Sequence, residues 1–157
     1  MNAAYLSAVL LGGSIAAVLD IVFAILFAAY NGATPIRLLQ TVASGLLGTA
    51  AFTGGVPVAA LGLLLHFVMS FFWAGSFLLL ASMVPALTLH PVVSGIVFGA
   101  FVFLAMRLIV LPLSAFPYPV TFKPLATVLD LLSHSLLFGV PIAWAIQKAL
   151  LNVPTKT

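Results

Sequence analysis

The chain has 157 residues, of which 64% are hydrophobic and only 4% are charged, and its formal net charge is +3. Soluble globular proteins carry about 25% charged residues, so this composition excludes a soluble domain. The five basic residues are scattered and form no patch that would bind nucleic acid. The sequence contains no cysteine, which excludes disulfides, thiolate metal ligands and cysteine nucleophiles. We therefore expect one membrane domain over residues 1–157.

Four apolar segments are long enough to cross the hydrocarbon core of a bilayer, which takes about 20 helical residues. No basic residue precedes the first segment, and its apolar run is too long for a cleaved signal peptide, so we expect it to be retained. Proline-containing stretches at 31–35, 83–91 and 114–124 predict turns between the segments. The predicted transmembrane helices are Tyr5–Tyr30, Val56–Met83, Pro91–Leu113 and Leu125–Ala149. The predicted fold class is all-α, polytopic.

Residues 35–51 predict a shorter helix of a different kind. Thr34 is suited to cap its N-terminus and Pro35 to occupy its first position. Polar residues recur along it at spacings of three and four, which is typical of an amphipathic helix that lies in the interface or re-enters the membrane. Several glycines and a short apolar length argue against a fifth span. The polar residues are Arg37, Gln40, Thr41 and Ser44.

The third predicted span contains Gly95 and Gly99, a GxxxG spacing that lets two helix backbones approach closely. The sequence does not decide whether the partner helix belongs to the same chain or to another. The small size and short loops favour, as an alternative function, a non-catalytic accessory subunit of a larger membrane complex or a homo-oligomer.

Every predicted span carries at least one ionisable residue, and all of these residues fall in the same half of the bilayer by helical rise. They are Asp20, His66, Arg107, Asp130 and His134. A charge at membrane depth costs roughly 2.5–3.5 kcal/mol, so these side chains should face one another inside the bundle. Arg107 can neutralise one carboxylate. The second carboxylate then needs a proton, a histidinium or a bound cation.

Asp130 and His134 lie one helical turn apart, so the carboxylate can orient the imidazole and favour its protonated form. His66 and Ser70 repeat this spacing on the second span. Three interpretations stay open: a network that only holds helices together, a proton or ion pathway or sensor, and a ligand site.

His66 and His134 could also bind a single b-type haem or a metal, since they lie at similar depth on different helices. No metal-binding spacing such as HExxH supports this alternative. The sequence also lacks a nucleophile elbow and a glycine-rich phosphate loop, so we do not expect an enzyme and expect no cofactor.

Three short motifs in the second half carry a family resemblance: LHFVMSFFWAG at 65–75, RLIVLPLSAFP at 107–117 and DLLSH at 130–134. Over residues 61–149 the chain resembles the YagU-like family of bacterial inner-membrane proteins. It departs from that family at Asp130, where the family has glutamate, and at Arg107, where it has histidine. The resemblance implies an inner-membrane protein associated with acid tolerance.

We therefore expect a multi-pass protein of the bacterial inner membrane, in contact with lipids and without nucleic-acid partners. The loop charges are nearly balanced, with Lys148 and Lys156 on one side and Arg37 and Lys123 on the other, and we expect cytoplasmic termini. The expected function is proton-linked transport or an acid-stress response that depends on the intramembrane Asp, His and Arg residues.

Overall fold

The computed structural model describes residues 3–152, so the ends of the predicted domain, including Lys156, lie outside the described residues. Within this range the chain is helical and has no strands. Its elements in order are α1 (Ala3–Tyr30), α2 (Pro35–Leu47), the 3₁₀-helix η1 (Gly48–Thr53), α3 (Gly55–Met83), the 3₁₀-helix η2 (Pro85–Thr88), α4 (Pro91–Ala105), the π-helix η3 (Met106–Val110), α5 (Leu111–Leu113), α6 (Pro124–Leu132), the π-helix η4 (Ser133–Gly139) and α7 (Val140–Asn152).

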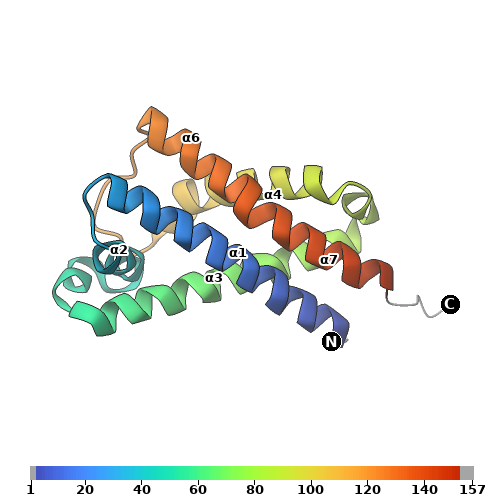
Figure 1. The fold of residues 1–157 in the computed structure, drawn as a ribbon, viewed down its shortest axis with the longest axis horizontal. Coiled ribbons are helices and arrows are strands. Elements are labelled where there is room, and N and C mark those ends of the chain that lie inside the picture. The colour runs from blue at the N-terminus through green and yellow to red at the C-terminus, as the bar shows by residue number, and fades with distance from the viewer. Residues whose placement is uncertain (1–2, 153–157) are drawn as a thin grey trace.

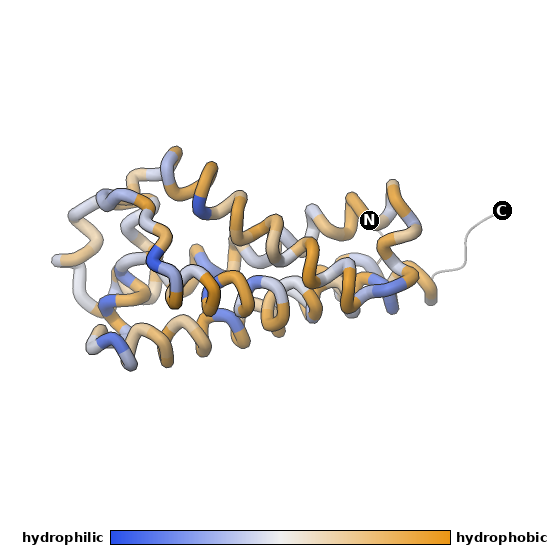
Figure 2. Tube along the Cα trace, turned by 90° about the horizontal axis from the view of Figure 1, so that it is seen from above, coloured by the Kyte–Doolittle hydropathy of each residue, from blue (hydrophilic) through white to orange (hydrophobic). Residues whose placement is uncertain are grey.

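Four helical runs in the described chain are long and apolar enough to cross a membrane: Ala3–Tyr30, Gly55–Met83, Pro91–Leu113 and Pro124–Leu151. The all-α polytopic fold is therefore confirmed. The third run has the bounds that the sequence predicts. Many large apolar side chains on these helices are exposed, and Figure 2 shows apolar residues along most of their length. Such an outer surface suits contact with lipid rather than water.

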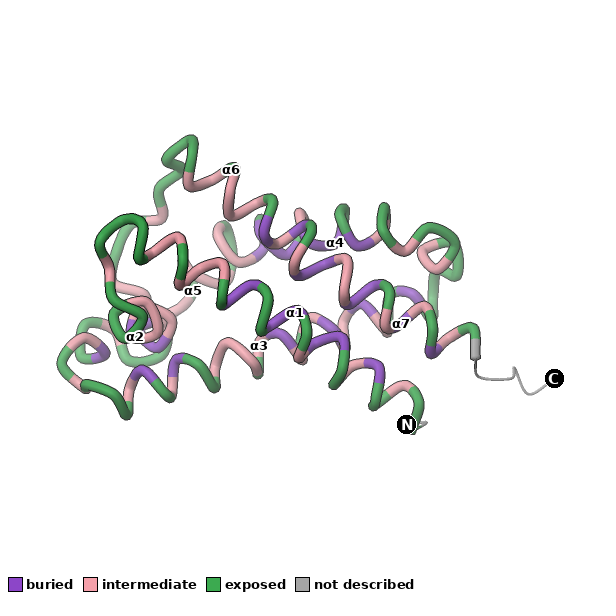
Figure 3. The backbone as a smooth tube through the Cα atoms, viewed as in Figure 1, coloured by how far each residue is buried: buried purple, intermediate pink, exposed green. Residues whose placement is uncertain are grey.

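The four runs form an elongated bundle (Figure 1). α1 packs against α3 and against the fourth run, while α4 packs against η4 and α7. The start of α1 and the end of α7 lie at one end of the bundle, and α2 lies at the other. The buried residues follow the helix faces that meet in the interior, as Figure 3 shows, and the apolar core there includes Phe77, Phe98, Ile142 and Ile146.

The GxxxG glycines of α4 make a contact within the chain. A Cβ atom added at Gly99 would collide with the backbone carbonyl of His134, and one added at Gly95 would lie 2.8 Å from the carbonyl oxygen of Gly139. Gly139 in turn faces the backbone of both α4 glycines. The sequence left open whether this spacing serves an internal or an oligomeric contact, and the structure assigns it to the seam between α4 and η4.

α2 crosses the bundle at the end opposite the start of α1, and Figure 1 shows it almost end-on while the long helices run across the view. As predicted, Thr34 caps it, because its hydroxyl oxygen accepts a hydrogen bond from the Arg37 amide at 3.1 Å. The buried face of α2 carries Gln40, Ala43 and Ser44. α2 approaches α3 so closely that a Cβ atom at Gly62 would collide with the carbonyl of Leu39. The helix ends at Leu47 and continues as η1, so the predicted single helix over 35–51 has two parts.

Candidate functional site

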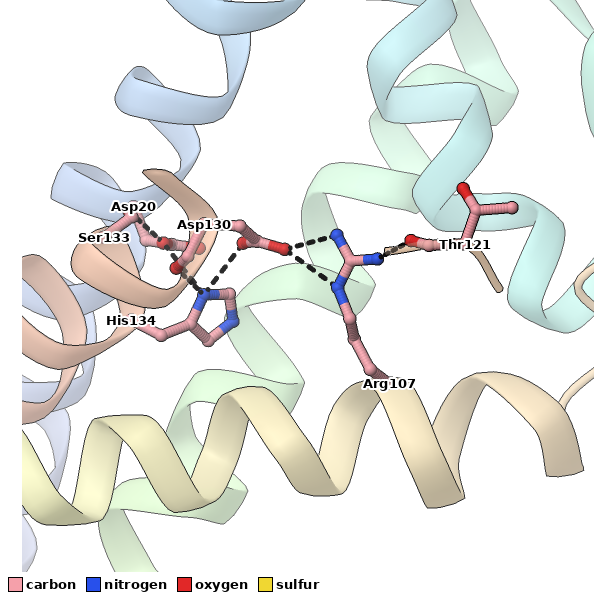
Figure 4. Close-up of polar contacts among 6 residues, drawn as sticks. All are labelled: Asp20, Arg107, Thr121, Asp130, Ser133 and His134. Carbon is pink, nitrogen blue, oxygen red and sulfur yellow. Dashed lines mark hydrogen bonds and ion pairs between the residues drawn. The ribbon is translucent and has the colours of Figure 1, made fainter. Parts of the chain in front are cut away.

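His134 lies between two carboxylates that come from different spans (Figure 4). Its Nδ1 atom is 3.1 Å from Oδ1 of Asp130 and 3.9 Å from Oδ1 of Asp20. The same atom is 3.0 Å from the backbone carbonyl oxygen of Asp130. Because a carbonyl oxygen can only accept, Nδ1 carries a hydrogen in this arrangement. The other ring nitrogen, Nε2, is therefore the atom at which the imidazole gains or loses a proton.

Arg107 binds the second oxygen of Asp130. Its Nη2 and Nε atoms donate to Oδ2 at 2.8 and 3.2 Å, respectively. Its Nη1 atom donates to the backbone carbonyl of Thr121 at 2.7 Å. The guanidinium therefore neutralises Asp130 and also holds the segment 114–123, which connects the third and fourth runs.

Asp20 has no guanidinium or ammonium partner in the described chain. Its carboxylate is buried, with 8% of the residue exposed, and Oδ1 accepts a hydrogen bond from the Ser133 hydroxyl at 2.6 Å. The cluster, which we define as Asp20, Arg107, Asp130, Ser133 and His134, therefore holds two carboxylates and one guanidinium. Its formal charge is −1 when His134 is neutral and 0 when His134 is protonated.

Three residues of this cluster lie in π-helical turns, whereas Asp20 lies on α1 and Asp130 on α6. Arg107 lies on η3, and Ser133 and His134 lie on η4. π-helical turns are rare and are frequent at functional sites. A π-helical turn also changes which side chains share a face, and here Ser133 points at Asp20 while His134 points at both carboxylates.

A cavity of about 530 Å³ adjoins the cluster. Its walls come from α2, α3, the end of the third run, the segment 114–123 and α6–η4, and they are mainly apolar. Arg107, Asp130 and His134 lie on its wall, and His66 of α3 lines it as well. The His134 ring also contacts Phe103, with 5.9 Å between ring centroids. Cavities of about 300–1,000 Å³ with a few polar groups are typical of small-molecule sites.

The structure brings together four of the predicted site residues: Asp20, Arg107, Asp130 and His134. His66 and Ser70 do not join them. The Nε2 atom of His66 donates to the carbonyl of Ala17 at 3.0 Å, and the Ser70 hydroxyl donates to the carbonyl of Gly13 at 2.7 Å. These two bonds tie α3 to α1 at adjacent helical turns.

Sequence reasoning did not identify Ser133 or the carbonyl of Thr121 as part of the cluster. A serine in an apolar run is common, and nothing in its spacing indicates a carboxylate on another helix. A backbone carbonyl leaves no signal in a sequence. The cavity also went unpredicted, because it depends on how α2 and the segment 114–123 cover the bundle.

A haem or metal bound by His66 and His134 stays a prediction. Each imidazole directs one nitrogen at a protein oxygen, which leaves its other nitrogen as the available ligand atom. The described residues contain no group of three or more acidic or histidine side chains placed to hold a metal ion.

Comparisons of the chain with models of protein families, with curated proteins and with solved structures found no match. The resemblance to the YagU-like family therefore stays a prediction.

Proposed function

We propose that this chain is a small bacterial inner-membrane protein that takes up and releases a proton at His134 and links that step to a small solute in the adjoining cavity. One observation carries the proposal. His134 faces both carboxylates of the cluster, while the guanidinium of Arg107 lies on Asp130 alone.

The charge of the cluster supports a proton-binding role. With His134 neutral, the charge on Asp20 is balanced by no cation within the cluster, and a single charge in a membrane costs roughly 2.5–3.5 kcal/mol on insertion scales. A proton on His134 removes this imbalance without movement of a helix, because Nδ1 already faces both Asp20 and Asp130. The cluster is thus built to hold one exchangeable proton.

The cavity supports a link to a solute rather than a purely structural role. A network that only joins helices needs no empty space beside it, and the α4–η4 seam is packed in this way, because backbone meets backbone at its glycines. Here three members of the cluster line a cavity of about 530 Å³. A solute in that cavity would lie beside the group whose charge changes. From the resemblance to the YagU-like family we also propose acid stress as the setting.

Flux in proteoliposomes tests the proposal. The full chain is reconstituted with a pH-sensitive dye in the lumen, and a pH gradient is imposed with inorganic ions, small organic cations or small organic anions outside. We expect proton flux above that of empty liposomes for the wild type. We expect His134→Ala and Asp20→Asn to reduce it to the empty-liposome level.

His90→Ala is the matched control, because His90 is an exposed histidine in the turn before α4 and lies outside the cluster. It should keep the wild-type rate. If the wild type and both cluster variants give the same flux under every solute condition, the proposal is wrong.

A further inference from the structure

We propose that the solute is a lipophilic ammonium ion, which donates an N–H hydrogen bond to Nε2 of His134, places its apolar part in the cavity and exchanges against the proton. This inference rests on the proposed function and names its substrate class. It depends on the charge of the cluster, on the free face of the His134 ring and on the walls of the cavity.

The charge of the cluster selects a cation. The cluster has a formal charge of −1 while His134 is neutral, and one proton or one monovalent cation brings it to zero. An anion is disfavoured, because the Arg107 donors already bind Asp130 and Thr121 and a second carboxylate lies nearby on Asp20. Two cations at once would leave the cluster positive in a low-dielectric site.

The ring of His134 selects an ion with an N–H group. Its Nδ1 hydrogen is held by Asp130, so the neutral ring presents Nε2 as an acceptor. No hydrogen bond to this atom is found among the described residues. Figure 4 shows Nε2 on the edge of the ring that faces away from Asp20, and the residue lines the cavity. When Nε2 takes a proton it can no longer accept, so the proton and the ammonium ion exclude one another.

The cavity walls select an apolar body. Leu65, Met69 and Val110 line it beside the aromatic residues Phe103 and Phe116. Aromatic faces attract organic cations, by about 0.5–2 kcal/mol. A strongly hydrated inorganic cation would find few oxygen ligands on these walls, whereas an alkyl or aryl ammonium would bury its carbon atoms there.

The charged groups that face His134 account for a pH dependence at this residue. They are Asp20 from α1 and Asp130 from α6, while Arg107 from η3 binds the other oxygen of Asp130. His66 from α3 lines the same cavity, but its Nε2 hydrogen is engaged by Ala17. α2 contributes uncharged residues to the wall, and Lys148 of α7 lies over the ring of Trp144 instead.

Calorimetry on the full chain in lipid nanodiscs tests the inference. The probe is 4-phenylbutylammonium, titrated in two buffers that differ in their heat of ionisation and at several pH values. At low pH, where His134 is protonated, we expect binding of the ammonium ion to release protons. As the pH is lowered through this range, the affinity for the ammonium ion should fall by about tenfold per pH unit, as for two ligands that compete for one site.

A second probe requires no mutation. The N,N,N-trimethyl derivative has the same charge and the same apolar body but no N–H donor, and we expect it to bind at least tenfold more weakly. Among variants, His134→Gln retains an acceptor that cannot take a proton, so it should bind the amine without pH dependence. Asp20→Asn should weaken binding at least tenfold, and His90→Ala should leave it unchanged.

The outcomes separate this inference from the proposed function. Equal affinities of the amine and its trimethyl derivative, no amine binding, or binding without proton release would overturn the inference. If His134-dependent proton flux persists in that case, the proposed function stands with another solute. If His134→Ala leaves the flux unchanged, the proposed function itself fails.

Discussion

The two partly buried histidines, His66 and His134, differ in the ring nitrogen that carries hydrogen. His134 directs Nδ1 at a carbonyl oxygen, while His66 directs Nε2 at one. We therefore expect neutral His134 to be the Nδ1–H tautomer and neutral His66 the Nε2–H tautomer. Nitrogen-15 NMR of the histidine-labelled protein, with assignment by the single alanine variants, measures this directly. An Nε2–H tautomer at neutral His134 would contradict the proposed acceptor.

Ser133 contributes a hydrogen bond to a buried carboxylate. We expect Ser133→Ala to lower the free energy of unfolding by about 1.5 kcal/mol, between the values typical of interhelical bonds in membranes and of bonds to charged groups. Thermal unfolding in detergent measures it. Ser82→Ala is the matched control, because the exposed Ser82 hydroxyl bonds only to its own helix at Leu79, and it should change stability by less than about 0.5 kcal/mol.

Arg107 and Asp130 should be energetically coupled. Arg107→Gln leaves both carboxylates of the cluster without a guanidinium. Because the Arg107 and Asp130 side chains are only partly buried, we expect a smaller loss than the about 3–5 kcal/mol that removal of one partner of a fully buried pair costs. In the Arg107→Gln/Asp130→Asn double variant that unpaired charge is gone. We expect the double variant to lose less stability than the sum of the single losses, by about 1–3 kcal/mol. Additive losses in a double-mutant cycle would mean that the ion pair contributes nothing.

At the level of helices, the α4–η4 seam should be the contact least tolerant of added volume. A Cβ atom at Gly99 collides with the backbone at His134, whereas one at Gly75 meets no atom within 4 Å. We expect Gly99→Ala to destabilise the fold by about 1–3 kcal/mol and Gly75→Ala to be neutral or slightly stabilising. Unfolding midpoints in detergent give both values. If the two variants have equal stability, the seam is not as tight as described.

The sequence predicted the helical elements well because apolar length and proline positions determine them. The span Pro91–Leu113 was predicted to the residue, and Thr34 caps α2 as expected. The predicted site was less complete. Asp20, Arg107 and the Asp130–His134 pair converge because charges in a membrane must find partners. The π-helical turns at η3 and η4 were missed, since they arise from packing between helices and not from local residue preference.

His66 shows why depth alone did not define the site. It lies in the same half of the bundle as the cluster, but it faces a backbone carbonyl of α1 and not a carboxylate. A histidine can satisfy a buried position with one hydrogen bond to a carbonyl, and spacing on its own helix does not distinguish the two cases. The rotation of α3 relative to its neighbours decides between them.

For the whole molecule, the fold predicts that successive connections between the spanning runs lie at opposite ends of the bundle. Thr49 in η1 and Ala86 in η2 are both exposed, and Figure 1 shows η1 near α2 and the α3–α4 connection at the end that carries the chain termini. The sequence has no native cysteine, so single cysteines at these two positions report sidedness without background. In sealed vesicles, a membrane-impermeant maleimide should label one of them and not the other. Equal labelling from one side would exclude the four-span topology.

The contact of Arg107 with Thr121 makes the outer wall of the cavity depend on the same side chain that neutralises Asp130. The segment 114–123 is further attached to α2, where the Ala115 amide donates to the Gly45 carbonyl at 2.9 Å. If this segment moves away to admit a molecule, either the guanidinium gives up the Thr121 carbonyl or it follows the segment and leaves Asp130. Displacement of this segment therefore breaks a hydrogen bond of Arg107, either to Thr121 or to Asp130, so the position of the segment is coupled to the guanidinium that neutralises Asp130.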